Sequence, residues 1–243
     1  MDEFKITTIL IDESSSKSFS IFNPNEWENK SKAIIQSCAT ELSLIEYIVK
    51  RLEKLCSNPK EMCQKHFMTL IQQWEMNHWE ISKANYYAQI PEMHLLITGF
   101  FSMAKSLLDI IVQLLYTEGI VNNYIDGFHK SKDVFGGEVL NILNNNSIAS
   151  YKQKAEEIHD FLFIQKKIWI DDLIFFRNKF VHIEEGAHQA MFLMEFDIKN
   201  NRLVFKNAQP PSINEITIDD YCKNKLENIR GFSISILKEI RKQ

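Results

Sequence analysis

Apolar residues recur at intervals of three and four along five long stretches of the chain. This spacing matches the roughly 3.6 residues of one helical turn, so each stretch predicts an amphipathic helix. Only 7 glycines and 5 prolines occur in 243 residues, which favours long regular elements over tight turns. The predicted helices cover residues 26–56, 60–88, 92–118, 151–185 and 219–240, with a shorter helix near 137–144.

Prolines and glycines mark the expected ends of these helices. Pro59 and Pro91 suit the first turns of the second and third helices, and Gly119 closes the third. The third helix has a broad apolar face, which predicts a place at the centre of a bundle. The fourth is expected to bend near Asp160 and to end at Gly186.

Two segments have the residue pattern of β-hairpins instead, with apolar runs on both sides of a polar turn. Residues 4–11 and 18–22 flank the polar stretch DESSSKS and predict one hairpin. Residues 190–198 and 202–206 flank the turn Lys199-Asn200-Asn201 and predict a second. The two hairpins could share one sheet.

The expected fold is therefore mainly α. We predict a single domain over residues 1–243, an antiparallel up-and-down helical bundle with small β-hairpin additions. One hairpin falls at the N-terminus, within residues 1–23, and the other lies before the last helix, within 189–207.

Composition and charge narrow the function classes. The net charge of −4 gives no global basic field for nucleic acid, although residues 199–243 carry nine Lys and Arg against five Asp and Glu. That local excess fits an anionic partner or a solvated helix face equally. The four cysteines and the histidines show no metal-ligand spacing, so we expect reduced thiols, no metal and no cofactor.

The chain start and the apolar runs predict a cytoplasmic protein. MDEFKITTILIDESSS has acids where a signal peptide has bases. Apolar runs such as IWIDDLIFF are soon broken by charges, so no membrane span is expected.

One arginine stands among large apolar residues, in the stretch FFRNKFVHIEEG. Arginine is rare in this chain, with 5 among 28 basic residues, and its planar fork suits phosphate or carboxylate. No carboxylate lies three or four positions from Arg177, so its anion is expected on another helix, a second subunit or a ligand. Its helical neighbours are Leu173, Ile174, Phe180 and Val181.

Asn178 and His182 are four positions apart, so they share a helix face. The amide can bond one ring nitrogen and leave the other free for chemistry. The pattern R-N-x-x-x-H near the end of a long helix resembles the signature of the HEPN superfamily. That signature is an arginine, a polar residue, and a histidine four to six residues further on, here Arg177, Asn178 and His182.

The resemblance covers about residues 26–240 and implies a metal-independent endoribonuclease. The implied roles are general base or acid for His182, acting at the ribose 2′-hydroxyl or the leaving oxygen, and charge stabilisation at phosphorus for Arg177. The implied products are a 2′,3′-cyclic phosphate and a 5′-hydroxyl. Toxin–antitoxin or antiphage defence, with an antitoxin or other regulatory protein as a partner, is implied in the same way.

A homodimer is also expected. Five helical positions place Arg177 and His182 about 140° apart, which is awkward for one phosphate unless two copies contribute to a shared cleft. HEPN nucleases are known as such dimers. A toxin branch of the family continues the signature as His-x-Tyr, whereas Ile183 and Glu184 follow here, so control through that tyrosine is not expected.

Asp109 is the expected support for Arg177. It belongs to a polar stripe with Ser102, Lys105 and Ser106 on the third helix, which could line the cleft or be an ordinary exposed face.

Two other functions for the chain stay open. The chain could be a non-catalytic HEPN-like module that binds RNA or a protein, or a structural bundle in which Arg177 pairs with a buried acid.

Overall fold

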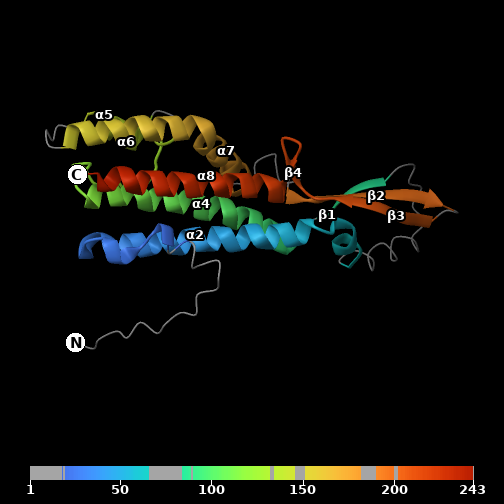
Figure 1. The fold of residues 1–243 in the computed structure, drawn as a ribbon. Helices are drawn as coiled ribbons and strands as arrows, with labels where there is room; N and C mark the ends of the chain where they lie inside the picture. Colours follow the sequence, from blue (N-terminus) through green and yellow to red (C-terminus); the bar gives the residue numbers. More distant parts are fainter. Residues whose placement is uncertain are drawn as a thin grey trace.

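Long antiparallel helices form the body of the molecule, and a sheet projects beyond one end (Figure 1). The computed structural model describes residues 18, 20–65, 84–88, 90–131, 134–145, 151–181, 190–199 and 202–242. The helices are η1 (Pro24–Glu26), α2 (Asn29–Cys56), α4 (Pro91–Thr117), α5 (Gly137–Asn144), α6 (Lys152–Gln165), η3 (Lys166–Ile170), α7 (Asp171–Val181) and α8 (Ile218–Arg241). The strands are β1 (Ala84–Ala88), β2 (Phe192–Lys199), β3 (Arg202–Gln209), β4 (Ser212–Ile213) and β5 (Ile216–Thr217).

Side-chain bonds between helices fix their directions. Ser106 Oγ of α4 donates to Glu41 of α2, and Arg51 of α2 bonds Glu92 at the other end of α4, so these helices are antiparallel. Two bonds from α8 to α2 show that these helices are antiparallel. The Lys154–Ile240 bond and the Phe161–Phe232 ring contact show the same for α6 and α8. The predicted antiparallel up-and-down helical bundle is confirmed, and α7 therefore runs opposite to α4.

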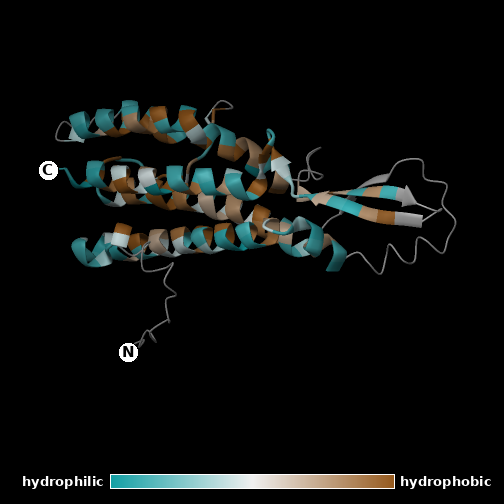
Figure 2. Ribbon diagram, turned by 45° about the vertical axis from the view of Figure 1, so that its right-hand side comes forward, coloured by the Kyte–Doolittle hydropathy of each residue, from teal (hydrophilic) through white to brown (hydrophobic). Residues whose placement is uncertain are grey.

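The third predicted helix is α4, and it lies at the centre as expected. It packs on α2, α7 and α8 and buries twelve of its 27 residues. Figure 2 shows apolar residues concentrated along α4. By length and composition α4 is also apolar enough to cross a membrane, which corrects the expectation that no segment is. A core helix needs the same composition, because it is covered by neighbours on several sides.

The long helix predicted over 151–185 is interrupted, but not near Asp160. A π-helical turn, η3, separates α6 from α7 between Lys166 and Ile170. Trp169 in this turn is buried, and its Nε1 donates to Gln165 at 2.8 Å. The ring packs edge-on against Phe232 of α8 at 5.7 Å, so burial of this large side chain is coupled to the wider turn.

The second predicted hairpin is confirmed as β2 and β3, with a bulge between Glu195 and Phe196. Its sheet partner differs from the prediction. Residues 84–88, expected at the end of a helix, form β1 and pair antiparallel with β2. The helix beginning at Pro59 is described only to Lys65. Aromatic residues in ANYYA favour an extended strand once a partner strand is present.

The N-terminal hairpin prediction is wrong where the structure tests it. Ser18, Ser20 and Ile21 are helical, so 18–22 is not a strand, and 4–11 lies outside the described residues. A short hairpin that was not predicted, β4–β5, turns at Asn214 and Glu215, which both have positive φ. It leads directly into α8.

Candidate functional site

Arg177 lies in the last described turns of α7, at the end of the bundle from which the sheet projects. Aromatic contacts from two helices hold this part of α7. Phe101 of α4 stacks on Phe180 with ring centroids 5.3 Å apart, and Tyr221 of α8 contacts Phe176 at 5.6 Å. The backbone that carries Arg177 is therefore fixed from both sides.

The guanidinium itself is half-buried. Its Nη1 donates to the side-chain oxygen of Asn178 at 3.2 Å, and its Nε is shielded from solvent. Asn178 was predicted to orient His182, but in the structure its amide oxygen accepts a hydrogen bond from Arg177. His182 lies outside the described residues, as do Glu184 and Glu185. The observed bond restricts the rotation of the guanidinium and so favours a defined direction for its remaining donors.

Asp109 is engaged by its own helix and by a loop. Lys105 Nζ contacts both carboxylate oxygens, at 2.6 Å to Oδ2, and the backbone N–H of Phe128 donates to Oδ1 at 2.6 Å. A Cβ at Gly127 would meet Oδ1 at 2.6 Å, so glycine permits this close approach. These contacts join Asp109 to Lys105 and to the loop, and its support of Arg177 stays a prediction.

The start of α7 is tied to α8 by a cluster around Asp172. Tyr221 donates its hydroxyl to Asp172 at 2.8 Å, and Lys225 Nζ lies 2.5 Å from the same oxygen. Burial, together with the bond to Asp172, raises the pKa of Tyr221 well above its ordinary value. This cluster could not be predicted from the sequence, because its members lie on different helices, about 50 positions apart, and have no local spacing pattern.

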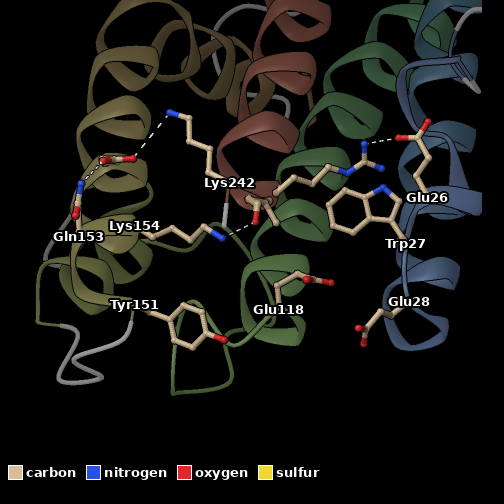
Figure 3. Close-up of a pocket in the computed structure, with 11 residues that line it drawn as sticks. Glu26, Trp27, Glu28, Glu118, Tyr151, Gln153, Lys154 and Lys242 are labelled. Carbon is tan, nitrogen blue, oxygen red and sulfur yellow. Dashed lines mark hydrogen bonds and ion pairs between the residues drawn. The ribbon is translucent and has the colours of Figure 1, made fainter.

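One pocket lies at the opposite end of the bundle, where four chain segments meet (Figure 3). It has a volume of about 740 Å³. Arg241 binds Glu26 and sits 4.6 Å from the ring centre of Trp27, while Lys154 donates to the carbonyl of Ile240 at 2.8 Å. These contacts link the chain segments that line the pocket. No predicted site residue lies in its lining.

The four cysteine thiols are free and buried. Burial raises the pKa of the Cys63 thiol to about 11 and shifts those of Cys38, Cys56 and Cys222 upward as well. Within the described ranges, no group of three or more His, Cys, Asp or Glu could hold a metal ion.

Fold and site together define a mainly helical antiparallel bundle with a half-buried arginine at the sheet-bearing end. No protein-family model matches the chain, and no curated protein or solved structure matches it significantly. What the site does must therefore be inferred from its own residues.

Proposed function

We propose that the chain is a metal-independent endoribonuclease of the HEPN type, acting in the cytoplasm in toxin–antitoxin or antiphage defence. The ribose 2′-oxygen attacks phosphorus, and the bond from phosphorus to the 5′-oxygen breaks. His182 takes the 2′-proton as general base or supplies a proton to the leaving oxygen as acid. Arg177 stabilises the charge on the phosphoryl oxygens.

The environment of Arg177 carries this proposal. The residue is a permanently charged fork on a rigid helix end, half-buried and oriented by Asn178 at 3.2 Å. Guanidinium matches phosphate oxygens in a bidentate manner, and partial burial strengthens that attraction.

We propose further that two copies form the active unit, with Arg177 and His182 of both chains in one cleft. Support comes from apolar side chains exposed along the helical run that leads to Arg177. Ile164, Ile168 and Phe175 are 53%, 61% and 53% exposed. Large exposed apolar residues on one run of helix are typical of a protein contact surface.

The test is cleavage of total RNA in EDTA by wild type, Arg177→Ala and His182→Ala. Matched controls are Arg51→Ala, in a partly exposed ion pair with Glu92, and His159→Ala, beside Asp160. We expect chelator-resistant cleavage that both site variants lose and both controls keep. Equal cleavage by all five proteins would refute the assignment, and light scattering of the wild type tests the dimer.

A second candidate is a non-catalytic HEPN-like module that binds RNA or a protein partner. The net charge of −4 and the exposed apolar run on α6, η3 and α7 favour it. Binding to RNA or to a partner protein without any cleavage by the wild type would select this function over the nuclease.

A further inference from the structure

The helix that faces Arg177 carries a lysine at the same level. The contact between Phe101 of α4 and Phe180 of α7, at 5.3 Å, sets the register of these antiparallel helices. Lys105 is four residues beyond Phe101, about 6 Å along α4. Arg177 is three residues before Phe180, about 4.5 Å in the same direction because α7 runs oppositely. The two residues therefore differ in level by only about 1.5 Å.

The two residues also share the facing sides of their helices. Positions three or four apart lie on one helix face, so Lys105 follows Phe101 and Arg177 follows Phe180. Packed helices lie about 8–10 Å apart, which is within the combined reach of a lysine and an arginine side chain. The ammonium and the guanidinium can thus meet one small group at the seam between α4 and α7.

Lys105 is held in place for such a contact. Its ammonium bonds Asp109, at 2.6 Å to Oδ2, and Asp109 is fixed in turn by the backbone N–H of Phe128 at 2.6 Å. The lysine side chain is 17% exposed and that of Asp109 is 25% exposed, so the pair is partly sheltered but reachable.

We propose that Lys105 is a second phosphate-binding residue of the Arg177 site, and that Asp109 positions it. The ligand is the phosphodiester of single-stranded RNA, so the inference rests on the proposed function for its substrate. Two adjacent cations suit the additional negative charge that develops on the phosphoryl oxygens during 2′-oxygen attack. A phosphate oxygen can accept from Lys105 while Asp109 keeps the ammonium aligned.

The experiment separates binding from chemistry by using a fully 2′-O-methylated RNA decamer, which cannot be cleaved by 2′-oxygen attack. Affinity is measured by fluorescence anisotropy over a salt series for wild type, Lys105→Gln, Lys105→Arg and the control Lys50→Gln, an exposed lysine of α2. We expect about tenfold weaker binding for Lys105→Gln, with the log–log salt slope reduced by about 0.7. Lys105→Arg should keep the slope, and Lys50→Gln should match wild type.

The same proteins are then assayed for cleavage of unmodified RNA. If wild type cleaves and Lys105→Gln matches it in affinity, slope and rate, the Lys105 role is refuted while the nuclease stands. If wild type cleaves nothing but the salt slope still falls in Lys105→Gln, the nuclease is refuted and the Lys105 role stands. No binding by wild type overturns the Lys105 role. Should Lys105→Gln fail to fold, Lys105→Met, which keeps the apolar stem, replaces it.

Discussion

A buried ion pair between α2 and α8 supports a quantitative prediction about stability. Glu46 is only 2% exposed, and its Oε1 accepts from Arg230 Nε at 3.0 Å and Nη2 at 2.8 Å. Arg230 is 28% exposed and also donates to Glu227 at 2.6 Å. Loss of the arginine should therefore destabilise the fold more than loss of the negative charge on Glu46, because only Arg230 has a second partner and access to water.

This asymmetry fixes the order of the expected effects. Arg230→Met removes both donors and leaves a buried carboxylate uncompensated, which should cost about 3–5 kcal/mol. Glu46→Gln keeps an acceptor, and Arg230 retains Glu227 and access to water, so a cost of about 1–2 kcal/mol is expected. The double variant Glu46→Leu, Arg230→Met replaces the pair by apolar groups and should fall within about 1 kcal/mol of wild type.

Urea unfolding followed by circular dichroism measures these differences. Lys223→Met is the matched control, because Lys223 and Glu53 join the same two helices but are 58% and 40% exposed. Its cost should be clearly smaller than that of Arg230→Met, because water and salt screen an exposed pair. If Arg230→Met were no more destabilising than Lys223→Met, Glu46 would have to be solvated and the reasoning from burial would be refuted.

Three further changes test local features. Gly231→Ala should stabilise by about 0.5–1 kcal/mol in urea unfolding, because an added Cβ meets nothing within 4 Å on α8; destabilisation would show that something covers this position. Burial raises the pKa of the Glu41 carboxyl above its ordinary 4.5, so the free energy of unfolding should fall as pH rises from about 4.5 through the raised value. Glu41→Gln should remove that fall and be more stable than wild type at pH 7 but not at pH 4; identical pH profiles would refute it. Tyr221→Phe deletes the hydroxyl bond to Asp172 at 2.8 Å and should cost about 1–2 kcal/mol, since the acceptor is charged; a neutral result in the same unfolding assay would contradict this.

The helices were predictable because their signal is local. The three-and-four periodicity of 92–118 and 219–240 gave α4 and α8 to within one residue at each end. Strand β1 was not predictable in this way. Its partner β2 lies more than 100 positions away, and pairing overrides the helical pattern of the preceding residues. The prediction failed where a distant partner decides the local structure.

In the candidate site, too, features with a local sequence signal were predictable and features set by distant contacts were not. The apolar neighbours of Arg177 in the sequence predicted its place on a helix, and the structure finds it there on α7, half-buried. The bonds that Asp109 makes were not predicted, because its proposed link to Arg177 was based on opposite charge alone. The observed partners of Asp109 are the Phe128 N–H and Lys105. The loop can bring Phe128 to Asp109 because residue 127 is a glycine, and no periodic pattern in the sequence indicates this approach.

The direction in which Arg177 points depends on an irregularity upstream. A π-helical turn holds about one residue more than an α-helical turn, so η3 rotates α7 relative to a continuous extension of α6. A straight helix over 151–185 would turn residues after Lys166 by up to about 100°, which is one helical position. Phe180 would then turn away from Phe101, and Arg177 would turn with it. The sequence therefore gives the spacing of the residues in a helical motif. It does not give the direction in which their side chains point when an irregular turn precedes the motif.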